Sequence, residues 1–175
     1  AGITNIRLGA KASLVCTAYK NAERFFPAGK VRLTGNPIRK AFTNALSDAA
    51  ESKKALGFDD RKKVLLVLGG SLGARAMNVQ MAASMAALNA QGWQILWQCG
   101  KLYEEEYAPM ATPQTHIQAF IDDMATAYAA ADAIVSRAGA GTLSELCLVG
   151  KASVLIPSPN VAEDHQTHNA RALSD

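Results

Sequence analysis

The sequence predicts an α/β protein with a Rossmann-like, doubly wound parallel sheet. Residues 64–68 form a continuous apolar run, which is typical of a strand buried on both faces. This run and a second short strand at residues 133–136 each lead into a glycine-rich turn followed by a helical pattern. Because strands and helices alternate along the chain, we expect parallel strands joined by helices that cover both faces.

The first part of the chain has its own short elements. A weak helical pattern over residues 4–14 leads into a strand near Cys16, and another short strand is expected at residues 31–34. The triplet at residues 35–37 (GNP) predicts a turn. We therefore place a boundary after Pro37, with residues 1–37 in one part and residues 38–175 in the other.

The second part contains the regular alternation. A helix is expected over residues 38–56, with Gly57 as its stop. Later strands are expected at 93–99, 116–120, 132–136 and 152–156, and later helices at 101–110, 124–131, 143–149 and from about 165. Met77, Met81, Met85 and Leu88 recur at helical spacing, which favours a helix face packed on the sheet over a flexible methionine-lined ligand surface.

Composition excludes several classes of protein. Hydrophobic residues make up 49% of the chain, which argues against disorder. A net charge of +3 and an aromatic content of 6% do not support nucleic acid as a partner. Cys16, Cys99 and Cys147 each lie in an apolar segment and are expected to be buried, reduced thiols of a cytosolic protein. No stretch is apolar for long enough to span a bilayer.

The two glycine-rich turns predict binding of an anionic ligand. Small residues let a ligand approach backbone N–H groups at the positive end of a helix. The first turn lacks the Lys-Ser/Thr of a P-loop and the G-x-G-x-x-G spacing of dinucleotide sites, and the strand ending at Gln98 supplies no acidic ribose ligand. The sequence gives little indication of a metal site. The histidines have no acidic or thiol partners at zinc spacing, and there is no Asp-x-Asp pair. If a diphosphate binds here, we expect helix N-termini and arginine to balance its negative charge.

Two charged residues have open interpretations from spacing alone. Glu145 either stabilises the first turn of the helix after Gly141 or accepts hydrogen bonds from both hydroxyls of a ribose. Arg39 is either an ordinary surface arginine or, because it lies at the boundary between the two parts, a phosphate ligand.

Together the motifs resemble one family. The motifs occur in the order 34–39 (TGNPIR), 69–75 (GGSLGAR), 120–124 (FIDDM), 137–145 (RAGAGTLSE) and 164–170 (DHQTHNA). This series strongly resembles the MurG family, glycosyltransferases that move N-acetylglucosamine from UDP-N-acetylglucosamine to lipid I and so form lipid II for peptidoglycan. The resemblance implies a glycosyltransferase-B fold, with residues 1–37 as a remnant of the N-terminal acceptor domain and the linker, and 38–175 as a truncated C-terminal donor-binding domain.

The resemblance also implies residue roles. Ser71 and its turn would meet the diphosphate and Arg39 would pair with it, while Ile121 would form the uracil pocket beside Phe120. Glu145 would hold the ribose hydroxyls and Gln166 would read hydroxyls of the sugar. The remaining donor-contacting positions implied by the family are Asn5, Ala140, Gly141, Thr142, Leu143 and Ser144.

The resemblance further implies an inverting, metal-independent hexosyltransferase without a cofactor, at the cytoplasmic face of the inner membrane. Its acceptor loop, where a catalytic base belongs, lies outside this sequence, so we expect lipid I to bind through the missing domain and the fragment to be inactive. Three alternatives stay open: a UDP-sugar epimerase of the same fold, a non-catalytic nucleotide-sensing module, and a dinucleotide-dependent oxidoreductase.

Overall fold

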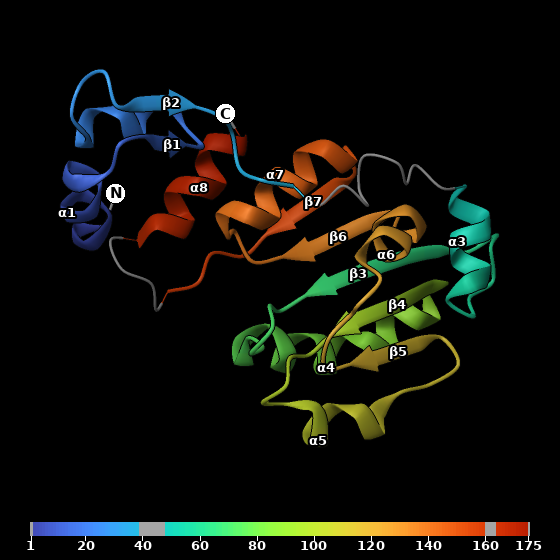
Figure 1. The fold of residues 1–175 in the computed structure, drawn as a ribbon. Coiled ribbons are helices and arrows are strands. Elements are labelled where there is room, and N and C mark those ends of the chain that lie inside the picture. Colours follow the sequence, from blue (N-terminus) through green and yellow to red (C-terminus); the bar gives the residue numbers. More distant parts are fainter. Residues whose placement is uncertain (1, 39–47, 160–163, 175) are drawn as a thin grey trace. The chain divides into compact units, whose positions relative to one another are not determined.

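A computed structural model describes residues 2–38, 48–159 and 164–174 of the chain. The chain divides into two compact units, Ala1–Ile38 and Arg39–Asp175. The second unit is the larger and contains the main sheet (Figure 1). Each unit is described by itself below.

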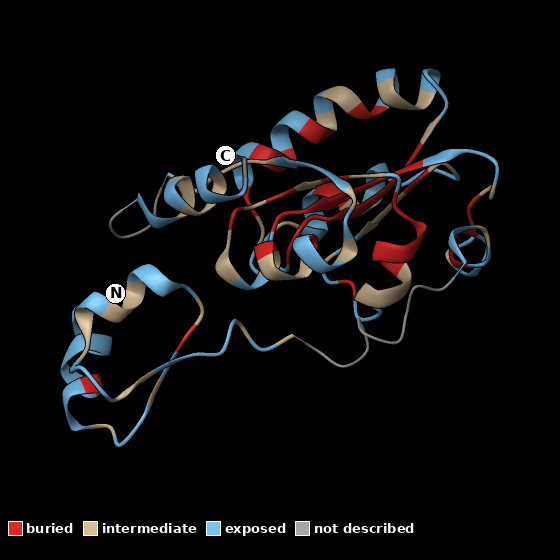
Figure 2. Ribbon diagram, turned by 90° about the horizontal axis from the view of Figure 1, so that it is seen from above, coloured by how far each residue is buried: buried red, intermediate tan, exposed pale blue. Residues whose placement is uncertain are grey.

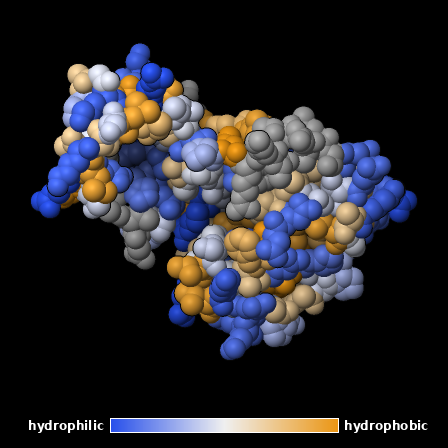
Figure 3. Space-filling model, viewed as in Figure 1, coloured by the Kyte–Doolittle hydropathy of each residue, from blue (hydrophilic) through white to orange (hydrophobic). Residues whose placement is uncertain are grey.

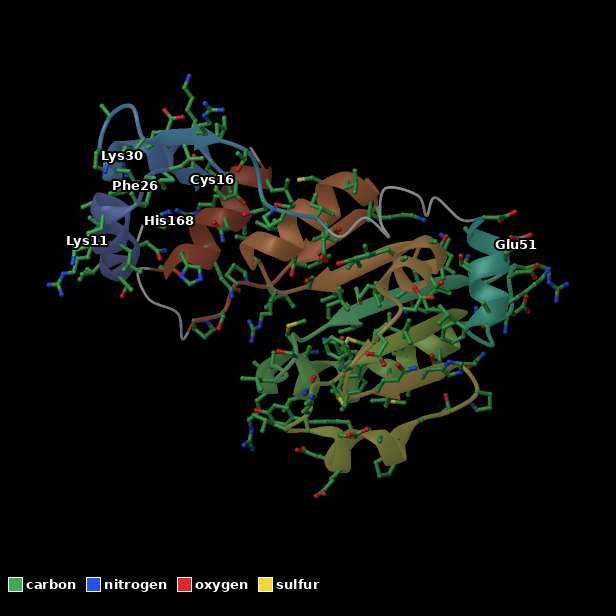
Figure 4. All side chains as sticks on the ribbon, in the orientation of Figure 1. Lys11, Cys16, Phe26, Lys30, Glu51 and His168 are labelled. Atoms are coloured by element: carbon green, nitrogen blue, oxygen red, sulfur yellow. The ribbon has the colours of Figure 1, made fainter. Side chains whose placement is uncertain are left out.

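The first unit is a helix beside a pair of parallel strands. It contains α1 (Ile3–Lys11), β1 (Val15–Thr17), the 3-10 helix η1 (Lys20–Phe25) and β2 (Val31–Leu33). β1 pairs in parallel with β2. The ring of Phe26 packs so closely on Gly9 of α1 that a Cβ at Gly9 would overlap it. The Lys30 ammonium donates to the Ala10 carbonyl at 3.1 Å, so the start of β2 is also tied to α1; both Phe26 and Lys30 are labelled in Figure 4.

The second unit is a five-stranded, fully parallel sheet with the order β5-β4-β3-β6-β7. Its strands are β3 (Lys63–Leu68), β4 (Trp93–Gln98), β5 (Thr115–Gln118), β6 (Ala133–Ser136) and β7 (Ala152–Leu155). Its helices are α3 (Ala49–Ala55), α4 (Arg75–Ala90), α5 (Glu104–Tyr107), η2 (Ala108–Met110), α6 (Met124–Ala130), α7 (Ala140–Val149) and α8 (His165–Ser174). The predicted parallel α/β sheet is confirmed.

The strand order makes the sheet doubly wound. Strands are added outward from β3 toward β5 in one direction and toward β7 in the other. Right-handed crossovers consequently place α4 and α7 on opposite faces. Figure 2 shows helices on both sides of the sheet, with buried residues concentrated in the strands between them. The sheet is therefore a central layer, and its carboxyl edge is left for loops.

One part of the core lies between α4 and the sheet. Met77, Met81 and Met85 are buried there against β3 and β4, and Leu88 packs against the same cluster. The predicted packing face of α4 is confirmed. Trp97 is fully buried, and its ring lies 5.1 Å from that of Tyr107 between centroids.

At the amino ends of the strands, an ion pair joins α3 to the sheet. The ammonium of Lys53 lies 2.8 Å from Oδ2 of Asp132, and the same oxygen accepts from the Val64 N–H at 2.8 Å. The α3 helix ends at Ala55 with Leu56 as its C-cap, just before the expected stop Gly57, whose φ is +79° and whose N–H donates to the Lys54 carbonyl. The outer surface of α3 is hydrophilic (Figure 3). Residues 39–47 of the helix expected over residues 38–56 lie outside the described residues.

Two expectations about local structure are wrong. The helix expected over residues 101–110 is two short pieces, α5 and η2, because Pro109 has no N–H to continue the α-helical hydrogen bonds. Cys99 is buried, but Cys16 and Cys147 are exposed free thiols. Cys16 lies on the outward side of the alternating strand β1, and Cys147 follows the buried Leu146 and is turned away from the core.

Candidate functional site

The two glycine-rich turns lie at the same edge of the sheet. β3 and β6 are adjacent parallel strands, with Leu68 opposite Ser136. The residues that follow these strands therefore leave the carboxyl edge side by side; in Figure 1 the arrowheads of β3 and β6 point the same way. Ligands of open α/β sheets bind in this position, where the strand order reverses.

The first turn is held in shape by the loop that follows β4. Gly70 and Gly73 have φ of +86° and +89°, values that only glycine adopts without strain. The Lys101 N–H donates to the Ser71 carbonyl at 3.2 Å, and the Gly69 N–H donates to the Gln98 carbonyl at 3.2 Å. A Cβ on Gly100 would overlap the backbone of Gly73. The two loops can come this close only because both positions are glycine.

Both helices that follow the turns begin without a side-chain cap. The residues before them, Ala74 for α4 and Gly139 for α7, make no capping hydrogen bond through a side chain. Neither helix has an acidic residue in its first turn. The positive ends of two helix dipoles thus reach the same edge of the sheet without a carboxylate from their own first turns, which suits an anionic ligand.

A cavity of about 290 Å³ lies between the two turns. Gly70 from the first turn and Gly141 from the second line it, and Arg137 and Glu145 bring charge to it. Its other lining residues are Leu68, Gln98, Phe120, Met124, Tyr128, Ser136 and Thr142. Polar and apolar walls of this kind can receive a base and a ribose as well as an anion.

The structure brings several predicted site residues together around this cavity. Gly141, Thr142 and Glu145 line it, whereas Ser71 and Ile121 are next to the lining residues Gly70 and Phe120. The other predicted residues of this helix are Ala140, Leu143 and Ser144. Leu143 is buried in the core, and the Ser144 hydroxyl donates to the Ala140 carbonyl at 3.1 Å.

The remaining predicted residues lie elsewhere or are not described. Gln166, in α8, accepts a hydrogen bond from the Ser158 N–H through Oε1 at 2.9 Å and is not among the residues lining the cavity. Asn5 is an exposed residue of α1 in the first unit. Arg39 lies outside the described residues.

The interpretation of Glu145 as a first-turn carboxylate is wrong. The helix α7 begins at Ala140, ahead of the predicted start at Leu143, because Gly139 already has extended backbone angles and ends the preceding loop. Glu145 is consequently in the second turn, beyond the N–H groups that it was expected to stabilise. Its side chain instead faces the cavity and accepts a hydrogen bond from the Tyr128 hydroxyl at 3.0 Å.

Sequence reasoning missed three residues of this site. Gln98 accepts a hydrogen bond from the Ile121 N–H through Oε1 at 3.0 Å, so it fixes the loop that carries Ile121. Arg137 donates to the carbonyls of Ile156 and Pro157, and its burial lowers the pKa of the guanidinium from its usual value. Tyr128 is the third. Gln98 and Arg137 had one signal in the sequence, a polar residue at or just after the end of a strand, whereas Tyr128 had none.

Two further observations concern other kinds of site. Within residues 2–38, 48–159 and 164–174, His, Cys, Asp and Glu residues form no group of three or more that could hold a metal ion. In the same ranges, no helix combines the length and the apolar character needed to cross a membrane.

The fold and the site define the chain as a glycosyltransferase domain. Residues 64–175 match the Glycosyltransferase family 28 C-terminal domain, and the chain belongs to this family. Among similar proteins, the UDP-N-acetylglucosamine--N-acetylmuramyl-(pentapeptide) pyrophosphoryl-undecaprenol N-acetylglucosamine transferase of Flavobacterium psychrophilum is 50% identical over 173 residues, or 98% of this chain and 47% of that protein. The protein of the same name from Phocaeicola vulgatus is 49% identical, over 99% of this chain and 47% of its own length. The chain thus spans about half the length of these relatives.

Solved structures agree with this assignment. The crystal structure of Acinetobacter baumannii MurG is 34% identical and has a TM-score of 0.66, over 100% of this chain and 48% of that one. The glycosyltransferase SnogD from Streptomyces nogalater has a TM-score of 0.54 at 15% identity, over 92% of this chain and 42% of that one, and shows the fold alone. The predicted fold class, one half of a glycosyltransferase-B fold, is confirmed.

Proposed function

We propose that this chain is the donor-binding half of an enzyme that transfers N-acetylglucosamine from UDP-N-acetylglucosamine to lipid I, forming lipid II for peptidoglycan. The observation that carries the proposal is the cavity between Gly70 and Gly141, at the sheet edge where two helices of a family 28 domain begin without side-chain caps. The names of the two relatives state the donor and the sugar that those proteins transfer. The cavity offers such a donor apolar walls, the Glu145 carboxylate and the start of α7.

In this proposal the diphosphate lies across the first turn. Ser71 and the backbone of its turn contact it, and Arg39 pairs with it. The uncapped start of α7 adds further N–H dipoles, with Ala140, Gly141 and Thr142 along the nucleotide. These groups act on the phosphates without a requirement for a cofactor.

The nucleoside occupies the part of the cavity beside Phe120 and Glu145. Uracil lies against the loop of Phe120 and Ile121, and the ribose hydroxyls donate to the Glu145 carboxylate. Because the Ile121 N–H already donates to the side chain of Gln98, a base that used this N–H would have to displace Oε1 of Gln98. Gln166 hydrogen-bonds to hydroxyls of the sugar, Asn5 contacts the donor, and Leu143 and Ser144 lie along the nucleotide with Ala140, Gly141 and Thr142.

The reaction is an inverting transfer. An acceptor hydroxyl attacks the anomeric carbon as the bond to UDP breaks, and negative charge grows on the departing diphosphate. Donors that are already oriented toward this charge favour the transition state over the ground state. The turn at Ser71 and the guanidinium of Arg39 supply this stabilisation.

We assign the two parts of the chain accordingly. Residues 1–37 belong to the acceptor domain and the linker, and residues 38–175 form the donor domain. The general base and the lipid I site belong to the rest of the acceptor domain, so the chain alone does not turn over. The complete enzyme works at the cytoplasmic face of the membrane, where its lipid-linked acceptor is held.

The test is an assay of a full-length protein that carries this segment, with UDP-N-acetylglucosamine and lipid I. The proposal predicts lipid II and UDP in equal amounts, and no UDP without lipid I. Release of UDP with an epimerised sugar in the absence of lipid I would instead identify an epimerase.

A further inference from the structure

A buried tyrosine contacts the carboxylate proposed to bind ribose. Tyr128, in α6, is only 2% exposed, and its hydroxyl donates to Oε2 of Glu145, in α7, at 3.0 Å. Both side chains line the cavity between the glycine-rich turns. The two residues come from different helices, so the hydrogen bond depends on how these helices pack.

The two partners differ in rigidity. Glu145 is partly exposed and has a flexible side chain that can turn its carboxylate in several directions. Tyr128 is a rigid ring packed in the core, and its helix is fixed at its start by Asp123, whose carboxylate accepts hydrogen bonds from the Thr126 N–H and hydroxyl. The Tyr128 hydroxyl is therefore a fixed point that selects one direction for the Glu145 carboxylate.

The hydrogen bond leaves the carboxylate able to bind more donors. An ionised carboxylate has about four acceptor positions on its two oxygens, and Tyr128 uses one of them. The two hydroxyls of a ribose can use others. A carboxylate that is already oriented loses less conformational entropy when it binds a ligand than one that rotates freely.

We propose that Tyr128 is a positioning residue for ribose recognition, which holds the Glu145 carboxylate in the orientation that accepts hydrogen bonds from the two ribose hydroxyls. The inference rests on the proposed function, which places the ribose at Glu145. Tyr128 acts through Glu145, so its loss weakens only ligands that carry these hydroxyls.

The test compares two ligands by calorimetry on the 175-residue chain. UDP carries both ribose hydroxyls, and 2′,3′-dideoxy-UDP carries neither. For Tyr128→Phe we expect UDP to bind about 3- to 10-fold more weakly, as for loss of one hydrogen bond, while the affinity for the dideoxy ligand changes less than about 2-fold. In a Glu145→Ala background, Tyr128→Phe should have no further effect on UDP binding.

The matched control is Tyr107→Phe. The side chain of Tyr107 is also buried, at 4% exposure, and lies in the core cluster beside Trp97, so this change removes a tyrosine hydroxyl outside the cavity. We expect it to leave the ratio of the two affinities unchanged. Thermal unfolding of each variant shows how much of any effect comes from lost stability.

The outcomes separate the inference from the proposed function. If Tyr128→Phe weakens the binding of both ligands equally, Tyr128 has a purely structural role and the inference is overturned. The inference is also overturned if Tyr128→Phe leaves the ratio of the UDP and dideoxy-UDP affinities unchanged while Glu145→Ala reduces that ratio. If Glu145→Ala leaves the ratio as it is in the original chain, the ribose is not at Glu145, and the donor assignment fails together with the inference.

Discussion

Replacement of Gly100 by alanine tests whether the loop after β4 shapes the first glycine-rich turn. The residue has φ of +91°, and an added Cβ would overlap the backbone of Gly73 in the turn. A non-glycine residue in this backbone region loses about 1–2 kcal/mol, and the overlap adds about 1–3 kcal/mol. We therefore expect Gly100→Ala to lower the free energy of unfolding by about 2–5 kcal/mol.

Gly92 provides a matched control. Its φ is +87°, but an added Cβ would meet nothing within 4 Å, so Gly92→Ala has the backbone penalty without the overlap. We expect it to lower the free energy of unfolding by only about 1–2 kcal/mol. The difference between the two variants measures the contact between the loops.

The assay is urea unfolding followed by tryptophan fluorescence. Both tryptophans, Trp93 and Trp97, lie in β4, so the signal reports the second unit alone. Calorimetry with UDP completes the experiment: displacement of the turn by Gly100→Ala should weaken UDP binding about tenfold or more, equal to about 1.4 kcal/mol, and Gly92→Ala should not change it. Equal loss of stability in the two variants, with unchanged UDP affinity, would refute the reasoning.

Two further predictions concern buried polar contacts. Asn78 is fully buried, and its side chain donates to the Cys99 carbonyl and accepts from the Trp97 indole. Asn78→Ala should therefore lower the free energy of unfolding, measured by circular dichroism in urea, by about 2–6 kcal/mol. A loss below about 1 kcal/mol would contradict this. Burial raises the pKa of Asp132, but hydrogen bonds from Lys53 and the Val64 N–H, with the charge of Lys53, outweigh this and leave the pKa below its ordinary value. The pair therefore stabilises the fold above the pKa of an unfolded aspartate, about 3.9, and this contribution is lost as the pH falls through the folded value. The Asp132 side chain is 38% exposed, so solvent screens the pair, and Asp132→Asn should lower the free energy of unfolding by only about 1 kcal/mol at pH 7. The variant should also be less dependent on pH below about 4, and parallel pH profiles would contradict the assignment.

Strands and turns could be predicted because their signals are local. The apolar run before Gly69 and the short strand before Arg137 each combine β-branched or aliphatic residues with a glycine-rich stop, and β3 and β6 lie at these positions. Strand order has no local signal. Right-handed crossovers fix the face on which each connecting helix lies but not the order of the strands, so the pairing of β3 with β6 comes from the structure alone.

Helix ends and the cavity walls were harder to predict. The effect of Pro109 on the helix expected at residues 101–110 was not foreseen, nor was the early start of α7 at Ala140. The hydrogen bonds from Tyr128 to Glu145 and from Ile121 to Gln98 join residues 17 and 23 positions apart. Such contacts depend on how helices and loops pack on the sheet, and no pattern in the sequence marks them.

The most direct test of the account is a calorimetric titration of the chain with UDP and with uridine, each in the presence of magnesium and of EDTA. If the two turns hold the diphosphate through backbone N–H groups and helix dipoles, UDP binds with the same affinity in both buffers. Uridine then binds about tenfold or more weakly, because it lacks the charged acceptors. UDP binding that requires magnesium, or uridine binding as tight as UDP, would contradict the account.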